Sequence, residues 1–97
     1  MLSINNTIAS QEFDQLQLKK LLKNNSFEIL SISLEQGHIF PEHVSPTDAV
    51  LVLLEGEIEF HILGEKYILQ KLQIFDFPAK TVHKVSARKD SKFIIIR

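Results

Sequence analysis

The chain has 97 residues, enough for one domain and too few for a second hydrophobic core. Its 44% hydrophobic and 24% charged content is typical of a globular protein, and a formal net charge of -1 gives no electrostatic reason to expect nucleic acid or an anionic membrane as a partner. The absence of cysteine excludes disulfides, thiolate catalysis and Cys-based zinc sites.

The first residues, MLSINNTIASQEF, lack both a basic start and an apolar segment long enough for export. No apolar run approaches the length needed to cross a bilayer. The sequence therefore predicts a soluble cytoplasmic protein with no nucleic-acid or membrane partner.

Residues 1–9 are polar and are compatible either with a frayed tail or with a strand added to a neighbour's sheet. From Ser10 to Asn24 the charge order predicts a short helix, because acidic residues follow Ser10 and lysines precede Asn24. The apolar positions of this segment do not form one stripe at a period of 3.6 residues. We therefore expect the helix to lie on the outside of a sheet.

From Ser26 onwards the hydrophobic period changes from helical to two, which predicts strands. The first strand has apolar residues on both faces and ends at Gly37, so we expect it to be covered on both sides. The run 48–54 lacks alternation, as expected for a central strand. Clean alternation over 57–62 leads to a hairpin turn at 63–66.

Further short strands are predicted at 67–69, 74–77, 82–87 and 93–96, with a polar turn at 88–91. Many short strands at this spacing indicate an all-β sandwich or small barrel. The predicted organisation is one domain over residues 1–97: an N-terminal arm with a short helix over 1–25 and a β-barrel over 26–97.

Two motifs in this chain resemble the two signatures of the cupin superfamily. The first signature is Gly, five residues, His-x-His, three residues, Glu, six residues and Gly, and here Gly37, His43 and Gly56 match it. The second His of that signature is replaced by Ser45 and its Glu by Ala49.

The second signature is Gly, five residues, Pro-x-Gly, two residues, His, three residues and Asn. Pro78 and His83 match it, whereas Leu72, Lys80 and Ala87 stand where the family has glycines and asparagine. The similarity covers roughly residues 26 to 97 and is closest to the small single-domain bacterial cupins. It implies a cupin-like β-barrel of the double-stranded β-helix, or jelly-roll, type.

In the cupins, two histidines and the Glu of the first signature and the His of the second hold a divalent metal. The resemblance therefore implies His43 and His83 as candidate ligands for Fe, Mn, Ni, Cu or Zn. A catalytic metal usually has about three protein ligands, so we expect this reduced set to bind metal weakly or not at all. Asp48 would replace the missing Glu only if a bulge or the loop re-aimed its side chain.

The other reading of these histidines is structural, since a lone inward His is more often a hydrogen-bonded core residue than a ligand. By strand parity His61 is expected to be solvated, and His38, which follows the turn glycine Gly37, is expected to lie in a surface loop. The phenylalanines are predicted to be core residues rather than parts of a cofactor site; they are Phe40, Phe75 and Phe77.

Three functional hypotheses follow. The first is a cupin-like module that binds a small molecule in a pocket between His43 and His83, with or without a weakly held metal. The second is a metal-dependent enzyme of the dioxygenase or isomerase kind, and no catalytic residue is assigned for it. The third is a structural or regulatory cupin that acts as a homodimer, to which residues 1–9 could contribute a strand.

Overall fold

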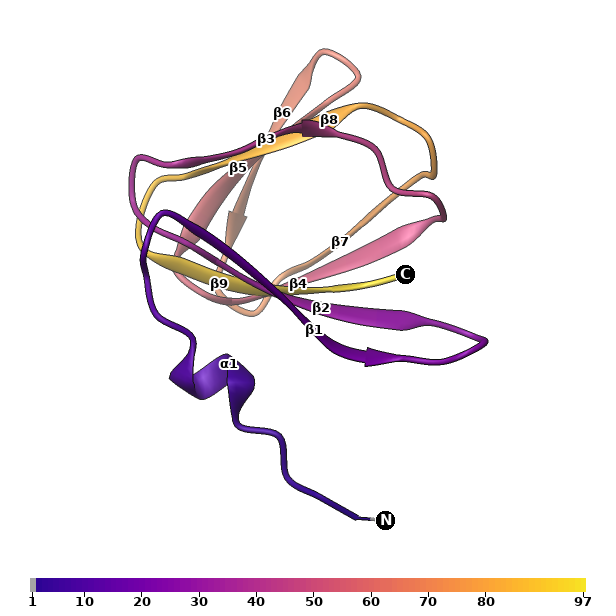
Figure 1. The fold of residues 1–97 in the computed structure, drawn as a ribbon. Coiled ribbons are helices and arrows are strands. Elements are labelled where there is room, and N and C mark those ends of the chain that lie inside the picture. The colour runs from indigo at the N-terminus through magenta and orange to yellow at the C-terminus, as the bar shows by residue number, and fades with distance from the viewer. Residues whose placement is uncertain (1) are drawn as a thin grey trace.

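The computed structural model describes residues 2–97, which form two antiparallel sheets and one short helix (Figure 1). The five-stranded sheet has the order β1-β2-β9-β4-β7 and the four-stranded sheet the order β3-β8-β5-β6. The elements are α1 (Thr7–Ser10), β1 (Leu16–Lys23), β2 (Glu28–Leu34), β3 (Ile39–His43), β4 (Ala49–Glu55), β5 (Glu57–Ile62), β6 (Glu65–Gln70), β7 (Ile74–Phe77), β8 (His83–Ala87) and β9 (Ser91–Ile96).

The predicted helix over Ser10–Asn24 is wrong for most of its length. The helix is the single turn α1, and Leu16–Lys23 forms the edge strand β1, which pairs with β2 in antiparallel register. A bulge between Lys20 and Leu22 accommodates adjacent leucines that a regular strand would place on opposite faces. Asn24, predicted as a helix stop, instead closes the β1–β2 turn by accepting the Ser26 and Phe27 amides on its side chain.

The strand β2 is covered on both faces, as its double-sided apolar pattern predicted. Leu30, Ile32 and Leu34 are buried towards the other sheet. On the opposite face Ser31 and Ser33 are also buried, because the segment after α1 lies over them: Ser31 donates to the Gln11 side chain, and Ser33 donates to the Glu12 carbonyl.

No helix among the described residues is long and apolar enough to cross a membrane.

The core lies between the two sheets and is built from every second residue of the facing strands. The burial pattern of β4, β5, β8 and β9 alternates along each strand, so each contributes one face to the core. The fully buried large side chains are Phe60, Phe93, Ile32, Leu34, Leu51, Leu53, Ile58 and Val85. Phe77 is buried, and Phe40 and Phe75 pack against this core, which confirms their predicted role.

Gly56 joins β4 to β5 at a point where the chain passes close to the turn before β9. Its φ is +88°, in the region that favours glycine, and a Cβ there would collide with the Asp90 carbonyl and with Ser91, whose Cα lies 2.7 Å away. Gly64, in the β5–β6 turn, has a similar φ of +75° but open space around it. Substitution at Gly64 would therefore cause backbone strain alone, whereas substitution at Gly56 would cause backbone strain and a steric clash.

We expect Gly56→Ala to destabilise the protein more than Gly64→Ala. Gly64→Ala should cost about 1–2 kcal/mol for a left-handed residue, whereas Gly56→Ala should add a further ~1–3 kcal/mol of overpacking. Urea denaturation of the two variants and the wild type measures the difference. Equal losses at the two positions would contradict the close approach of Gly56 to Ser91.

Candidate functional site

The two candidate histidines lie side by side on neighbouring strands. His43 ends β3 and His83 begins β8, and the two residues are paired directly across the ladder. Their ring centroids are 4.2 Å apart and the rings meet edge to face at 63°. The structure therefore brings together two residues that are forty positions apart in the sequence.

A bulge in β3 aims His43 inward. Regular alternation would place residues 40 and 43 on opposite faces, but the register shifts between Phe40 and His43. Pro41 lies inside this bulge, where a residue without an N–H group costs no ladder hydrogen bond. As a result the Phe40 and His43 rings stack, with centroids 4.1 Å apart and 12° between planes.

The hydrogen bonds of the two imidazoles fix their tautomers. The Nδ1 atom of His43 lies 2.7 Å from the Pro41 carbonyl oxygen, and that of His83 lies 3.0 Å from the Thr81 carbonyl oxygen. A carbonyl oxygen only accepts, so Nδ1 of each neutral ring carries the hydrogen and Nε2 retains a lone pair. Both rings thus have Nε2 available to accept a hydrogen bond or to ligate a metal.

His83 is embedded in aromatic side chains. Its ring stacks on Phe60 at 5.2 Å between centroids and lies 4.6 Å from Phe77, and only 2% of the residue is exposed. Burial lowers the pKa of His83, the hydrogen bond to Thr81 opposes this shift, and the charges of His43 and Arg97 lower the pKa further. His83 is therefore neutral at physiological pH.

The two replaced ligand positions have structural roles. Ser45 is buried and donates its hydroxyl to the Thr47 carbonyl at 2.7 Å, while its own carbonyl accepts the Lys80 amide. Ala49 is a core residue, 2% exposed. The Asp48 carboxylate is not re-aimed towards the histidines; it accepts the Ala79 amide at 2.9 Å and ties the loop before β4 to the loop before β8.

The donor set at the histidine pair does not fit a metal centre with three protein ligands. Among residues 2–97, no three side chains of His, Cys, Asp or Glu lie close enough together to hold one ion. Two imidazoles with free Nε2 atoms are the donors present. They suit hydrogen bonding to a ligand, or a metal that takes its remaining ligands from water or substrate.

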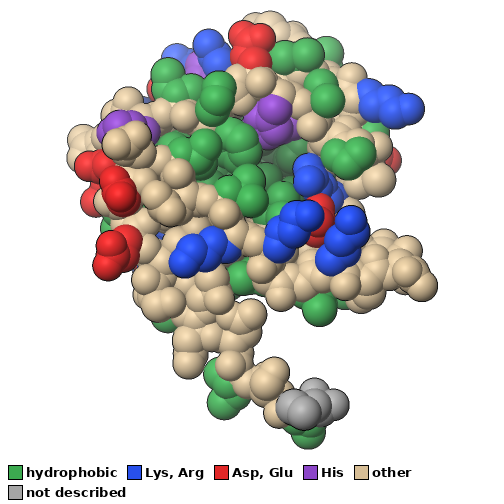
Figure 2. Space-filling model, viewed as in Figure 1, with side chains coloured by type: hydrophobic (Ala, Val, Ile, Leu, Met, Phe, Trp, Pro, Cys, Tyr) green, Lys and Arg blue, Asp and Glu red, His purple; other side chains and the backbone are tan. Residues whose placement is uncertain are grey.

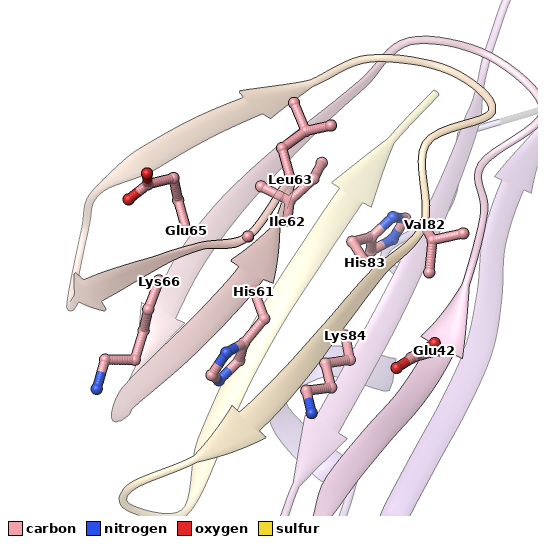
Figure 3. A pocket seen from close by; sticks show the side chains of 10 residues that line it. Glu42, His61, Ile62, Leu63, Glu65, Lys66, Val82, His83 and Lys84 are labelled. Carbon is pink, nitrogen blue, oxygen red and sulfur yellow. The ribbon is translucent and has the colours of Figure 1, made fainter.

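A cavity of about 290 Å³ borders His83 on the side of the β5–β6 hairpin (Figure 3). It is lined by Glu42, His61, Ile62, Leu63, Gly64, Glu65, Lys66, Val82, His83 and Lys84. The polar side chains of His61 and Lys84 are cross-strand neighbours and project from the sheet face opposite to the His83 ring. The cavity lies beside the histidine pair rather than between the two rings, and His43 does not line it.

Sequence reasoning missed this cavity because its walls come from three segments that only the fold brings together. The only part of the cavity wall that the sequence indicated was the hairpin turn at Leu63–Gly64, which lines the cavity together with His61. His61 is half-buried on the outward face of β5 rather than fully solvated. His38 lies in the turn after β2, where its Nε2 is 3.6 Å from a Glu35 carboxylate oxygen.

The open end of the space between the two sheets is hollowed, as Figure 2 shows. Hydrophobic side chains line the hollow, a histidine lies at its rim, and lysine and arginine side chains gather beside it. The Arg97 Nε atom donates to a Glu28 carboxylate oxygen at 3.0 Å, and the Arg97 charge is also one of the causes that lower the pKa of His83. That hydrogen bond is the main cause of the lowered pKa of Glu28.

Two antiparallel sheets that enclose a hydrophobic core, with a cross-strand histidine pair at one open end, define a small jelly-roll barrel of the cupin type. The family model described as "Cupin domain" matches residues 30–96. Because this match covers more than half of the chain, the chain belongs to the cupin family. The search of curated proteins finds no match.

Solved structures confirm the fold. An RmlC-like cupin protein from Desulfovibrio desulfuricans superposes with a TM-score of 0.87 at 24% identity, covering 99% of this chain and 95% of that one. The conserved protein SPY1581 of unknown function from Streptococcus pyogenes has a TM-score of 0.78 at 25% identity over 99% and 93% of the chains. KdgF from Halomonas sp. has a TM-score of 0.78 at 22% identity over 89% and 81%.

We expect the free energy of unfolding to fall as the pH drops below about 6.5, the ordinary pKa of an unfolded histidine. The lowered pKa of His83 means that the unfolded chain binds a proton before the folded chain does, so this contribution is complete above pH 6.5 and is lost towards the lowered folded pKa. Urea denaturation from pH 7.5 to 5.0 measures it, above the range in which Glu28 titrates.

The matched variant is His83→Phe, which keeps a ring against Phe60 and Phe77 but cannot titrate. It should be less stable at pH 7.5, because the Thr81 carbonyl loses its donor, and its stability should depend less on pH than that of the wild type. The same pH dependence in both proteins would show that His83 titrates normally in the folded state.

Proposed function

We propose that this protein is a cupin-type binding module that takes a small organic molecule at the histidine pair, without requiring a bound metal. The observation that carries the proposal is the pair of backbone hydrogen bonds at Nδ1 of His43 and His83, which leave two acceptor Nε2 atoms on adjacent, in-register rings. The ligand class that fits has hydroxyl, amine or amide donors for the imidazoles.

The surroundings of the pair support a ligand with an apolar portion. Phe40 stacks on His43, and Phe77 packs against His83, so a bound molecule would meet aromatic side chains next to the polar acceptors. Binding sites of this kind combine an apolar lining with a few placed polar groups. The neutral state of His83 favours such acceptor chemistry over recognition by a fixed positive charge.

The replaced ligand positions favour this function over metal-dependent catalysis. The hydroxyl of Ser45 is committed to its own turn, and Ala49 has no donor atom. Restoring a three-ligand centre would require rebuilding the loop that Asp48 and Ala79 hold together. The segment from Ser45 to Asp48, next to the replaced ligand positions, instead bonds to the loop before β8 and so helps to fix the position of His83.

Ligand binding should raise the melting temperature of the protein and should depend on His43. A panel of small polyols, hydroxy acids, amines and primary amides is screened by thermal shift, and a compound present at 100 times its dissociation constant should add about 2.7 kcal/mol of stability. His43→Ala should abolish the shift, because it removes one acceptor and the ring stacked on Phe40.

The matched control is His38→Ala, which removes a histidine from a turn outside the pair. The ligand should raise the melting temperature of this variant by the same amount as that of the wild type. If His43→Ala keeps the shift while remaining folded, the ligand binds elsewhere and the proposal fails.

Metal analysis provides a separate prediction. Untagged protein should contain well below one equivalent of Fe, Mn, Ni, Cu or Zn per chain, because two imidazoles alone bind such ions less firmly than the three or four protein ligands of typical sites. Elemental analysis after purification measures this content. A full equivalent that disappears in His43→Ala would instead favour the metal-dependent enzyme.

A further inference from the structure

A row of basic side chains crosses the outward face of the four-stranded sheet. His61 of β5 is the direct cross-strand partner of Lys66 on β6 and of Lys84 on β8. Cross-strand partners project to the same side of a sheet, and Figure 3 shows the three side chains pointing the same way. The residues on either side of His61 in β5 are buried in the core, so this row lies on the opposite side of the sheet from the core.

Two members of this row have no acidic partner. Lys66 is paired, with its Nζ atom 3.2 Å from a Glu59 carboxylate oxygen. The ion pairs within the described part of the chain include neither Lys84 nor His61, although both residues are half-buried. A half-buried lysine beside a histidine, with no carboxylate paired to either, favours a negatively charged ligand at this point.

The carboxylates that line the same cavity come from the two edge strands of this sheet. Glu42 belongs to β3 and Glu65 to the start of β6, and neither forms an ion pair with Lys84. Figure 3 shows Glu65 pointing to the other side of the sheet from the basic row. The inner strands β5 and β8 therefore present the basic groups, and the acidic groups lie at the margins of the cavity.

The cavity of about 290 Å³ has an apolar wall next to these basic groups. Leu63 in the β5–β6 turn and Val82 before β8 line it, and they are 76% and 54% exposed. Ligand sites commonly combine such apolar walls with a few placed polar groups, and their volumes begin at about 300 Å³. The cavity is thus suited to a small organic molecule with one charged end.

Leu63 stands at a turn position that does not favour leucine. Leu63 and Gly64 form the two-residue loop between the paired residues Ile62 and Glu65, and their φ angles are +53° and +75°. Asn or Asp before Gly is the usual choice for such a turn, because a branched aliphatic residue is strained in the left-handed region. Leu63 also gains little from burial in its own chain. A strained, exposed leucine at the wall of a cavity is expected if its side chain contacts a ligand.

We propose that this cavity is a second binding site, which takes a small organic phosphate. The phosphate group binds Lys84 and His61, and the apolar part of the ligand lies on Leu63 and Val82. The Lys84 ammonium supplies a fixed positive charge, and an imidazole has at least one N–H to donate in either protonation state. The site is separate from the histidine pair, because His43 does not line the cavity.

A titration of the ¹⁵N-labelled full chain with inorganic phosphate and with phenyl phosphate tests the proposal. Both probes should shift the amide resonances of residues 61–66 and 82–84 to saturation. Phenyl phosphate should bind about fivefold more tightly or better, because its ring covers apolar surface. Lys84→Gln should raise both dissociation constants about tenfold, since it removes a charge-assisted hydrogen bond. The matched control is Lys71→Gln, the same charge change on an exposed lysine of the β6–β7 turn, which should bind both probes like the wild type.

Leu63→Asn separates binding from folding. Asparagine suits the left-handed turn, so this variant should be at least as stable as the wild type in urea, yet it should bind phenyl phosphate no more tightly than inorganic phosphate. His43→Ala should leave the binding of both probes unchanged, whether or not the histidine pair binds a ligand of its own. Shifts that do not saturate, equal losses in Lys84→Gln and Lys71→Gln, binding that depends on His43, or an unchanged preference for phenyl phosphate in Leu63→Asn would overturn the proposal.

Discussion

The contacts of the Phe60 ring join the two sheets, and the rest of the structure depends on them. Phe60 belongs to β5 of the four-stranded sheet, yet its ring lies 4.8 and 4.9 Å from Phe75 and Phe77 of β7 in the five-stranded sheet. The same ring stacks on His83. Because one buried side chain contacts both layers and a candidate site residue, core packing holds His83 from one side while the tied loop before β8 holds it from the other.

Apolar patterning between turn residues made most of this architecture predictable. The strands β5 and β8 carry the period of two in their sequences, whereas β2, β4 and β9 are short runs rich in apolar residues; the sequences of all five therefore indicate strands. The edge strand β1 does not, since it is paired on one side only, mostly exposed and interrupted by a bulge. Its lysines and leucines favour helix locally, and pairing with β2 overrode that preference.

The candidate site was only partly accessible to sequence reasoning. The resemblance to the two cupin signatures implied that His43 and His83 lie close together, because both match positions that hold one metal in that family, and the strand register shows the two residues paired. The tautomers were not predictable, since they depend on the carbonyls of Pro41 and Thr81, whose directions are set by the bulge and by the loop. The cavity beside Lys84 was also not predictable from the sequence. Its shape depends on where the fold places the β5–β6 hairpin relative to β3 and β8.

The alternation that builds the core also gives each strand one inward and one outward face. Along β4, Leu51 and Leu53 face the interior, while Val50 and Val52 lie on the other side of the five-stranded sheet. The histidine pair lies on β3 and β8, in the other sheet. A substitution on the outer side of β4 therefore lies away from the pair, whereas one at Phe60 or Phe77 acts on the His83 ring directly, because these side chains contact it within the packed core.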